Sequence, residues 1–523
     1  MIRSTVSKAA LATSLRLPLS LSKMPCPRCK GMSVVRGKLT KKEVHLRKKA
    51  KLDPTTSPPT TPPNRMQLCT ACRGTGLIDN ASPPFSPHLS HPPPPTPKST
   101  DVIIVGAGIA GCALALSLQQ RNIPCVLFER DAAFSERKQG YGLTLQQGSK
   151  GLEGLGFENV FNSSSSSSNS PPSSSSSSSS FGIHSRRHFV FDSKGSKVGE
   201  WGMEVWHNNE EKSTTSKKKH NCHIARQTLR QRLMSELLPN TVQYGMDFAG
   251  YESSDCISAK FFSSSTPPPP TSPPTTIIGK LLVGADGIFS RVRKQKLNDK
   301  LRFLDVFVML GILPIPAQTP STHPLCDFKT VFQSSDGETR IYAMPYDETH
   351  YMWQLSFPIE NEVEGKQLTK SGGEGMKLEA ARRCGKVSGW EFEDIVTLIN
   401  STDEESISGY PVYDRDCVPL NLGENDSVAL IGDAAHPMSP FKGQGANQAI
   451  LDAVLLARMA FKQLKEEEEG EGKMRELLKE FEEQMMARAV PKVKASEEAA
   501  RALHTGSVLQ KGNFTRGKLK MIR

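Results

Sequence analysis

The sequence predicts an α/β fold in which a Rossmann-like domain is interleaved with an antiparallel β-sheet domain. The first observation is a run of buried-strand character, Asp101 to Val105, that leads through a glycine-rich turn into an apolar helix. The second is a pair of alternating segments, Arg340 to Tyr346 and His350 to Phe357, joined by the polar turn Asp347 to Thr349. Low-complexity tracts interrupt both patterns, and we expect them to be disordered insertions.

The charge of the chain is distributed unevenly, which narrows the class of partner. The 523 residues carry a net charge of +12, yet residues 1–100 alone hold 17 Lys and Arg against 3 Asp and Glu. Because the rest of the chain is nearly neutral, we expect no nucleic-acid partner. No segment approaches the roughly 18 consecutive apolar residues that a membrane-spanning helix requires, so we expect no transmembrane segment. Nothing in the sequence indicates an oligomeric state.

The first 23 residues have the composition of an organelle transit peptide. They contain four basic residues, several serines and no acidic residue, and their apolar residues are too interrupted for a secretory signal. This pattern is typical of targeting to a mitochondrion or plastid. The alternative is an untargeted tail on a cytoplasmic protein.

Two CxxC pairs lie in residues 24–80, ahead of a Pro/Ser linker at 81–100. They are formed by Cys26 and Cys29 and by Cys69 and Cys72, and four thiolates at this local spacing suit tetrahedral Zn2+. The second pair, CTACRGTG, resembles the repeat of the DnaJ-type cysteine-rich domain. Between the pairs lie 39 residues, more than the roughly 15 to 20 that are common in zinc ribbons. The pattern favours a structural zinc site over free thiols.

The first motif that carries chemistry is DVIIVGAGIAG, in which Gly106, Gly108 and Gly111 form G-x-G-x-x-G between a strand and a helix. Glycines there permit a tight turn, close approach of a pyrophosphate and close packing of the helix on its strand. The helix N-terminus offers free N–H groups to the phosphates. Glu129 ends the next strand, 18 residues after Gly111, where an acid can accept hydrogen bonds from ribose hydroxyls.

Two later motifs place an aspartate directly after a strand. In LLVGADGIFSRVR these residues are Asp286 and Gly287, and in VALIGDAAHPMSPFKGQGANQAILDA they are Gly432 and Asp433. Each motif alone is compatible with an ordinary Asp-Gly turn. An aspartate fixed at a strand end can also accept hydrogen bonds from a polyol chain.

The third motif continues through a Pro/Gly-rich turn into a helix over about Gln444 to Leu464. Pro440, Gly443 and Gly445 would bring backbone N–H groups and the helix N-terminus to a ring carbonyl that becomes anionic on reduction. His436 lies inside this motif, so a structural role at the cofactor is favoured over a role as a general base. A further helix, Met474 to Leu503, is expected to be interrupted at Pro491.

The alternating strands of the second domain offer candidates for a substrate pocket. Tyr342, Met344 and Trp353 are large side chains on these strands. For each of them, ordinary packing within the sheet is the alternative interpretation.

Taken together, these residues resemble the flavoprotein aromatic hydroxylase superfamily, the group A FAD-dependent monooxygenases that include p-hydroxybenzoate and salicylate hydroxylases. The resemblance covers most of the chain from Asp101 to about Arg458. It rests on GAGIAG, GADG and GDAAH in the family's order. It also includes the segment ARQTLRQRL, in which Arg226 matches an arginine beside the flavin, and the segment from Tyr410 to Arg415.

This resemblance implies FAD as cofactor, NAD(P)H and O2 as co-substrates, and a small, aromatic or cyclic organic substrate. The implied reaction is hydroxylation or epoxidation through a C4a-hydroperoxyflavin, with no catalytic side chain that can be assigned. Gly106, Gly108, Gly111 and Glu129 would hold the ADP half of FAD, and Asp433 the ribityl chain. The turn from Pro440 to Gly445 would face the flavin ring, and Asp286 and Gly287 would belong to a motif associated with both FAD and NAD(P)H.

The resemblance also implies how the chain is divided. The FAD-binding domain is expected to comprise residues 101–160, 222–300 and 408–460. The substrate-side sheet domain is expected to comprise residues 181–221 and 301–407, with C-terminal helices and a tail at 461–523.

Halogenase and prenyl-reductase relatives carry Trp-containing motifs that this chain does not match in full, which favours hydroxylation or epoxidation over halogenation or prenyl reduction. Two alternatives remain open. An FAD-dependent dehydrogenase or reductase without oxygen insertion is the alternative within the enzyme class. A non-catalytic flavin-fold scaffold with a zinc-binding interaction module is the alternative outside it, although the intact motifs favour an enzyme.

Overall fold

The computed structural model describes residues 98–136, 140–157, 160, 181–202, 221–263, 273–315, 325–423, 426–465 and 473–510, together with four short strands between residues 23 and 79. The predicted transit peptide, the serine tract at 163–180 and all four cysteines of the CxxC pairs lie outside the described residues.

The glycine-rich motif lies in a seven-stranded sheet of order β12-β6-β5-β15-β14-β13, with β21 paired to β15. The strands are β5 (Ser99–Val105), β6 (Cys125–Phe128), β12 (Val242–Gln243), β13 (Met246–Ser253), β14 (Ile257–Ser263), β15 (Thr275–Gly284) and β21 (Val428–Leu430). Strands β12, β6, β5, β15 and β21 are parallel to one another, whereas β13 and β14 form an antiparallel extension. The parallel part is the Rossmann-like domain that the sequence predicts.

A second seven-stranded sheet has the order β10-β9-β17-β18-β19-β16-β20. Its strands are β9 (Arg187–Asp192), β10 (Lys197–Gly202), β16 (Arg302–Pro314), β17 (Thr330–Ser335), β18 (Arg340–Pro345), β19 (His350–Pro358) and β20 (Ile407–Asp414). All its pairings are antiparallel except that of β9 with β17. A small third sheet, β7-β11-β8, joins Gly142–Leu145, Cys222–Ala225 and Ile183–His184.

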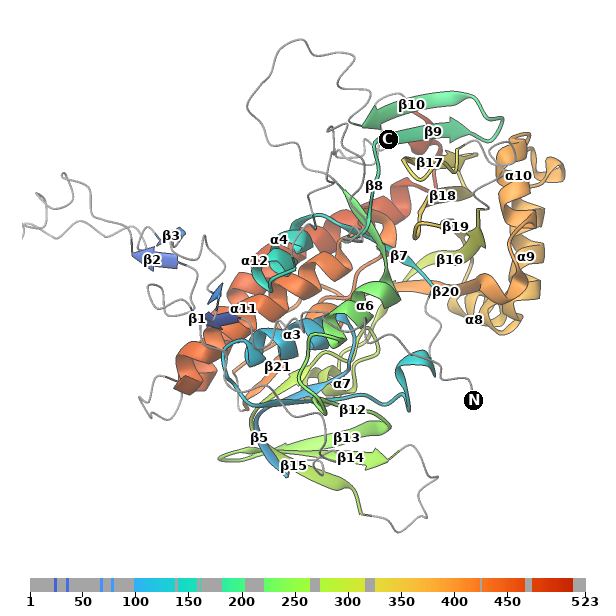
Figure 1. Ribbon diagram of the computed structural model, residues 1–523. Helices are drawn as coiled ribbons and strands as arrows, with labels where there is room; N and C mark the ends of the chain where they lie inside the picture. The colour runs from blue at the N-terminus through green and yellow to red at the C-terminus, as the bar shows by residue number, and fades with distance from the viewer. Residues whose placement is uncertain are drawn as a thin grey trace, which may run out of the picture.

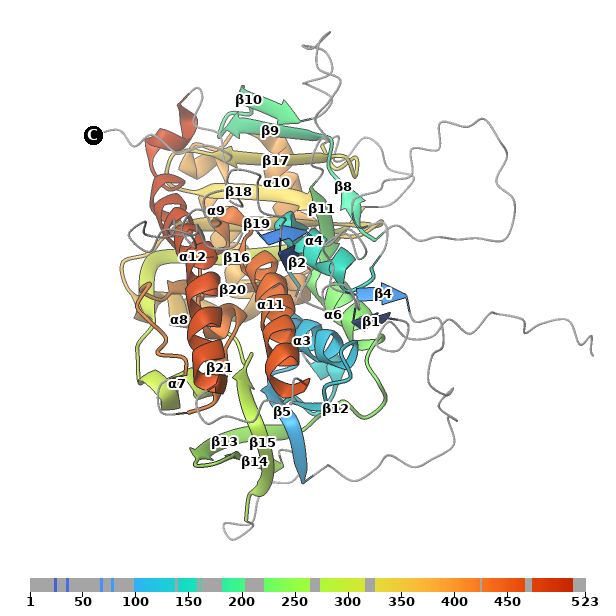
Figure 2. The same cartoon turned by 90° about the vertical axis from the view of Figure 1, so that its left-hand side faces the viewer.

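The helices form layers on these sheets. Their bounds are α3 (Ile109–Gln119), α4 (Gln147–Gly154), α6 (Arg226–Met234), α7 (Arg291–Leu297), α8 (Glu362–Lys370), α9 (Gly372–Arg383), α10 (Glu393–Asn400), α11 (Gly445–Lys465) and α12 (Lys473–Ala502). Figures 1 and 2 show α11 and α12 side by side, running from the first sheet toward the second, while α8, α9 and α10 cover the outer face of the second sheet. All residues of α3 are buried, which suits a helix packed between β5 and α11.

Two hydrophobic clusters lie on opposite faces of the second sheet. One contains Phe307, Ile341 and Trp353 together with side chains of α9 and α10. The other contains Leu310 and Met344 together with Phe441 and residues at the end of α12. The second cluster therefore faces the part of the chain that carries the third motif.

The α/β fold with an interleaved antiparallel sheet is confirmed, and the strand pair β18–β19 has the predicted turn, in which Asp347 accepts hydrogen bonds from the N–H groups of Thr349 and His350. Three details differ. Trp353 was a pocket candidate, but it lies in the cluster on the outer face, where its Nε1 donates to Thr402. Residues 407–414, placed from 408 onward with the FAD-binding part, form β20 of the second sheet.

The third difference concerns α12, which continues through Pro491 without a break. Proline removes one helical hydrogen bond and usually kinks or ends a helix. The neighbouring Ala489 and Val493 are both buried, so packing on either side of the proline holds the helix together. The predicted interruption at Pro491 is therefore wrong.

Four short strands frame the CxxC segments. Strand β1 (Lys23–Pro25) pairs antiparallel with β4 (Leu77–Asp79), and β2 (Val34–Arg36) pairs antiparallel with β3 (Met66–Leu68). The second pair is nested inside the first along the chain. Each CxxC therefore lies in a short segment that connects an outer strand to an inner one.

Candidate functional site

The three motifs begin at neighbouring strand ends. In the parallel register, Gly284 of β15 is paired both with Val105 of β5 and with Leu430 of β21. Val105 stands directly before GAGIAG, Gly284 is the first residue of GADG, and Leu430 stands two residues before the start of GDAAH. Ligands of open α/β sheets bind outside the carboxyl ends of the strands, so the sheet assembles the three motifs where a dinucleotide is expected.

The three glycines of the first motif lack a side chain for different structural reasons. Gly106 has a positive φ of +101°, and a Cβ there would lie 2.6 Å from the carbonyl oxygen of Ala285. A Cβ on Gly111 would lie 2.1 Å from the carbonyl oxygen of Gly106, because α3 starts against the turn. A Cβ on Gly108 would meet no atom within 4 Å. The space beside Gly108, at the N-terminus of α3, is therefore open to a phosphate.

Glu129 is fixed beside this turn at the end of β6. Its Oε2 accepts a hydrogen bond of 2.9 Å from the Ala107 N–H, and its Oε1 accepts one of 3.1 Å from the Asp131 N–H. Arg230 of α6 lies 3.7 Å from the same carboxylate and donates through Nε to the Ala107 carbonyl oxygen at 2.6 Å. Because a carboxylate has about four acceptor positions, Glu129 keeps capacity for a ribose hydroxyl.

The third motif is held by a buried ionic network behind it. The carboxylate of Asp452, on α11, accepts a hydrogen bond from the Gly432 N–H at 2.9 Å and lies 2.7 Å from His436 Nε2. Arg488 of α12 binds the other oxygen of this carboxylate. Burial by itself lowers the pKa of His436, but the charge and hydrogen bond of Asp452 outweigh it, and the net shift is upward. His436 is therefore paired with Asp452, a contact that suits the structural role favoured over that of a general base.

Asp433 differs from these residues because its carboxylate makes no hydrogen bond to any residue in the described part of the chain. It is half-buried, and its Oδ1 lies 3.4 Å from where a Cβ on Gly445 would stand. Burial raises the pKa of Asp433, and the charges of His436 and Arg226 offset part of that rise. A partly buried carboxylate with unused acceptor positions at the start of α11 suits the hydroxyl groups of a polyol chain.

The turn that precedes α11 has the shape that the sequence suggests. Pro440 opens a 3₁₀ turn, and the Gly443 N–H donates to its carbonyl oxygen at 2.9 Å, with Gly443 at a φ of +58°. Asn447 fixes this turn to the strand β7, because its Nδ2 donates to the carbonyl oxygens of Gly443 and Thr144, both at 2.9 Å. Its Oδ1 accepts from the backbone N–H groups at the start of α4.

Arg226 lies near the same point. It is the first residue of α6, its N–H donates to the Tyr141 carbonyl oxygen at 3.1 Å, and its guanidinium stands 5.2 Å from the centre of the Tyr141 ring. Burial raises the pKa of Tyr141, while the charge of Arg226 lowers it and that of Asp433 raises it. Tyr141, Arg226 and Asp433 therefore share one electrostatic environment.

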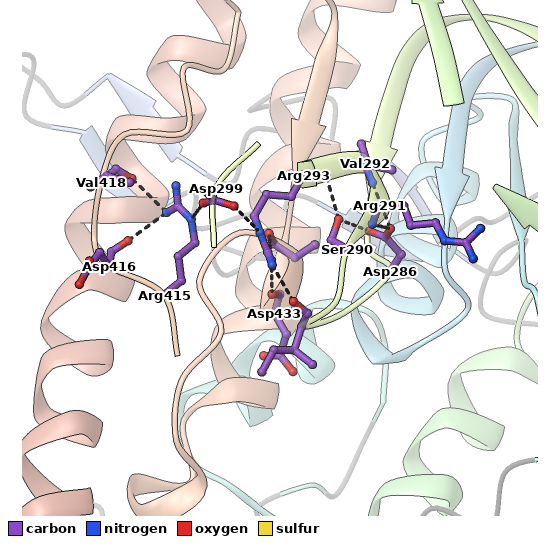
Figure 3. Close-up of polar contacts among 12 residues, drawn as sticks. Asp286, Ser290, Arg291, Val292, Arg293, Asp299, Arg415, Asp416, Val418 and Asp433 are labelled. Atoms are coloured by element: carbon purple, nitrogen blue, oxygen red, sulfur yellow. Dashed lines mark hydrogen bonds and ion pairs between the residues drawn. The ribbon is translucent and has the colours of Figure 1, made fainter. Parts of the chain in front are cut away.

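The second motif has a different local role (Figure 3). The carboxylate of Asp286 accepts a hydrogen bond of 2.6 Å from the Ser290 hydroxyl and one of 2.7 Å from the Arg291 N–H, at the start of α7. Burial raises the pKa of Asp286, and these hydrogen bonds oppose the rise. Asp286 thus shapes the turn, while Gly287 has a φ of +79° that favours glycine.

Arg293 connects this turn to the third motif. Figure 3 shows its guanidinium between Asp299 and the backbone of the GDAAH motif. Its Nη1 donates to the Ala434 carbonyl oxygen at 2.9 Å, and its Nε to Asp299 at 3.1 Å. Arg415, from the segment that follows β20, binds the same Asp299. Two motifs that are far apart in sequence are therefore locked together by one buried arginine.

One face of the second sheet, called here the inner face, lies against β7 and against the turn from Pro440 to Gly445, called here the flavin-side turn. The Gly142 N–H of β7 lies 2.9 Å from Met352 Sδ, and a Cβ on Gly142 would lie 2.4 Å from the Met344 methyl carbon. Phe441 of the turn belongs to the same cluster as Met344 and Met352. Met344 and Tyr342 therefore lie on the inner face, packed in this cluster, and their role in a substrate pocket stays a prediction.

The residues present fit FAD. The open space beside Gly108 can receive a pyrophosphate, and the unpartnered carboxylate of Asp433 can bind ribityl hydroxyls. The predicted cofactor-binding residues of the first and third motifs are thus brought to one edge of the first sheet.

Four residues that organise this site were not predicted: Arg230, Arg293, Asn447 and Asp452. Asp452 had a detectable signal, because it is a charge within the apolar run AILDAVLLA, and a buried charge requires a partner. Arg230 lies four residues after Arg226, and Arg293 lies six residues after Gly287. Both arginines donate to backbone carbonyl oxygens of distant segments. Such contacts leave no pattern in the sequence.

Comparison with known families gives one match over most of the chain. The model of a family described as FAD binding domain matches residues 99–372 and 393–496. Among the described residues, no helix is long and apolar enough to cross a bilayer.

The curated relatives include proteins named as monooxygenases. The 6-hydroxynicotinate 3-monooxygenase of Bordetella bronchiseptica is 29% identical over 34% of this chain and 44% of that protein. The 3-amino-4-hydroxybenzoate 2-monooxygenase PtnB3 of Streptomyces platensis is 25% identical over 68% of this chain and 78% of that protein. The chain spans less than half the length of the first curated relatives that it matches.

Solved structures agree with the fold. Klebsiella pneumoniae HpxO complexed with FAD and uric acid superposes with a TM-score of 0.60 at 20% identity, covering 77% of this chain and 89% of that one.

Proposed function

The chain belongs to the FAD binding domain family, and we propose that it is an FAD-dependent monooxygenase that uses NAD(P)H and O2 to hydroxylate or epoxidise a small cyclic organic substrate. The observation that carries this proposal is the alignment of Val105, Gly284 and Leu430 in one parallel register, which gathers the three motifs at one sheet edge. The names of the relatives support the same class of reaction.

When bound, FAD supplies the redox chemistry, accepting a hydride from NAD(P)H and activating O2. The protein binds and orients it. The N–H groups at the start of α3, reached through the open space beside Gly108, would bind the pyrophosphate, and Glu129 would bind the adenosine ribose. Asp433 would bind the ribityl chain, and the backbone of the Pro440 to Gly445 turn would stabilise negative charge on the ring.

The second sheet would hold the substrate and exclude water. Its inner face presents Leu310, Met344 and Met352, packed with Phe441 of the flavin-side turn. A water-excluded site limits the release of activated oxygen as peroxide. This arrangement favours oxygen insertion over the alternative of a dehydrogenase, which needs no such protection.

The test is a screen of NAD(P)H oxidation by the FAD-loaded protein, with a panel of aromatic and heterocyclic acids and phenols and with oxygen and peroxide measured together. We expect at least one compound to accelerate NAD(P)H oxidation while little peroxide accumulates. Turnover of a substrate in the absence of oxygen would support the dehydrogenase instead. A protein that takes up no FAD would support the non-catalytic scaffold.

We also propose that the segment 24–80 is a small zinc module, and one specific observation favours it. The nested pairs β1–β4 and β2–β3 place Pro25 opposite Leu77 and Val34 opposite Leu68. The two segments that contain Cys26, Cys29, Cys69 and Cys72 therefore start and end beside each other. Four thiolates from two adjacent short segments are the ordinary donor set of structural zinc.

Zinc content of the full chain tests this second proposal. We expect about one zinc per chain by elemental analysis, because four thiolates bind one ion. The double variant Cys26→Ser/Cys72→Ser should contain none, whereas the control Cys256→Ser, a half-buried cysteine outside the segment, should keep the metal. Equal zinc content in both variants would contradict the assignment.

A further inference from the structure

Arg340 is a buried cation that lacks an anionic partner in the part of the chain that the structure describes. It is the first residue of β18 and is 3% exposed. Its Nε and Nη2 both donate to the side-chain oxygen of Gln333, at 3.1 and 2.7 Å, and Nη1 makes no hydrogen bond to a described residue. Burying a charge without a counter-charge is costly, so such a residue calls for an explanation.

Three of the other buried arginines show the usual arrangement. Arg230 lies 3.7 Å from Glu129, and Arg293 lies 3.1 Å from Asp299, which also binds Arg415. Each of these arginines has a carboxylate within ion-pair distance. Arg340 is bound only by a neutral amide.

The surroundings of Arg340 are basic. Burial lowers the pKa of Arg340 to about 10. Burial lowers the pKa of Lys442, Glu498 offsets part of this, and the charge of Arg340 lowers it further. Burial also lowers the pKa of His504 to about 4, with a further contribution from Arg340. Lys442 and His504 thus both lie within electrostatic reach of Arg340; His504 is uncharged at neutral pH, so the positive charge that attracts an anion is that of Arg340 and Lys442.

Two side-chain amides that can form further hydrogen bonds lie on the same face of the sheet as Arg340. The side-chain nitrogen of Gln333, a residue that is 3% exposed, is buried without a hydrogen-bond partner among the described residues. The amide of Gln354 on β19 makes no hydrogen bond to a described side chain or backbone group. The sheet register pairs Gln333 with Tyr342 and Tyr342 with Gln354, so the three residues lie on one face, in a row across β17, β18 and β19. A buried amide N–H group without a described partner, a second amide on the same face and a guanidinium form an arrangement that a ligand can complete.

This row lies on the face of the sheet that meets the flavin-side turn. Ser356, the register partner of Arg340, lies 2.9 Å from His504 Nε2, and the His504 ring contacts the Phe441 ring at 5.2 Å between centroids. Phe441 belongs to the turn that is proposed to face the flavin. An anion bound at Arg340 would therefore sit on the substrate side of that turn.

We propose that Arg340, Gln333 and Gln354 form a subsite for an anionic oxygen group on the substrate ring, either a carboxylate or an ionised hydroxyl. This inference rests on the proposed function, and it specifies the substrate class as an aromatic or heterocyclic acid. The guanidinium supplies the charge and a planar pair of donors, and the amides supply further donors. Tyr342, whose ring lies 5.2 Å from the guanidinium carbon, lines the same face.

The test compares acids with their uncharged amides. FAD-loaded full-length protein is titrated with benzoate and benzamide, nicotinate and nicotinamide, and salicylate and salicylamide, with phenols as the second source of an anionic oxygen. Perturbation of the flavin absorption spectrum gives each Kd. We expect at least one acid or ionised phenol to bind about tenfold or more tightly than its neutral counterpart, which is the preference expected of charge-assisted hydrogen bonds.

Variants locate the preference. Arg340→Gln should abolish it, Arg340→Lys should keep part of it, and Gln354→Leu should weaken it. The control is Arg382→Gln on the outer helix α9, where Arg382 pairs with Glu379 and is exposed; it should behave as the unaltered chain. The FAD content of every variant is measured separately. Loss of FAD uptake by the unaltered chain would count against the proposed function. A chain that binds FAD but shows no preference for any acid, or an Arg340→Gln variant that folds and keeps the preference, would overturn the subsite.

Discussion

Two glycines of the same turn should respond to alanine in opposite ways. A Cβ on Gly108 would meet no protein atom within 4 Å, and its φ of −76° is accessible to alanine. A Cβ on Gly111 would stand 2.1 Å from the carbonyl oxygen of Gly106, which is backbone and cannot rotate away. The account assigns the open space beside Gly108 to the pyrophosphate of FAD.

The magnitudes follow from these contacts. Gly108→Ala should change the free energy of unfolding of the apoprotein by no more than about 0.5 kcal/mol, because a small loss at the helix cap is offset by reduced freedom of the unfolded chain. It should raise the Kd for FAD by about 5- to 150-fold, the equivalent of an overpacking cost of about 1 to 3 kcal/mol. Gly111→Ala should destabilise the apoprotein itself by about 1 to 3 kcal/mol or more.

The assay combines urea unfolding of the apoprotein with titration of FAD followed by quenching of flavin fluorescence. Gly154→Ala, at the end of α4, serves as the control, because a Cβ there also meets nothing within 4 Å and lies away from the motif. This control should retain both stability and FAD affinity. Unchanged FAD affinity in Gly108→Ala, with a stable fold, would refute the assignment of the pyrophosphate to this turn.

Three further predictions concern the network that supports the site. Because the pKa of His436 is raised in the folded state, its pairing with Asp452 stabilises the fold fully below about pH 6.5, and this stabilisation is lost as the pH rises through the folded pKa. The urea midpoint of the unaltered chain should therefore fall over this pH range, and His436→Gln should make the fall smaller. An equal fall in the variant would contradict this role of His436. Asn447→Leu leaves four backbone groups without the hydrogen bonds that Asn447 makes, so the free energy of unfolding should fall by about 2 to 4 kcal/mol. Calorimetric and chemical unfolding measure this change. A loss under 1 kcal/mol would contradict the role of Asn447 in connecting the turn to β7 and α4. In Arg293→Lys the lysine cannot bind Asp299 and the Ala434 carbonyl oxygen at the same time. The Kd for FAD should therefore rise about tenfold, the effect of one lost charge-assisted hydrogen bond. Full FAD affinity in equilibrium dialysis would show that the connection between the second and third motifs is not needed for binding.

The motifs could be predicted because each has a local cause. The glycines of the first turn, the strand before them and the acid Glu129 on the next strand are each readable from residue type and spacing. The alternating segments at 340–346 and 350–357 similarly carry their own pairing signal, and the structure has β18 and β19 there.

What the sequence did not predict depends on contacts between distant segments. The outer face that buries Trp353 is decided by which side of the second sheet the helices α9 and α10 cover, and alternation gives two equivalent faces. Asn447 and Arg293 bind backbone groups, so their partners have no sequence signature. The continuation of α12 through Pro491 likewise depends on packing by neighbouring side chains rather than on local preference.

The most direct test of the central claim is incorporation of labelled oxygen. A substrate found in the screen is turned over by the FAD-loaded chain under 18O2, and the product is analysed by mass spectrometry together with NAD(P)H consumption. We expect one 18O atom in the product for each NAD(P)H that is oxidised productively. A product that forms without 18O, or forms equally well under argon, would contradict it.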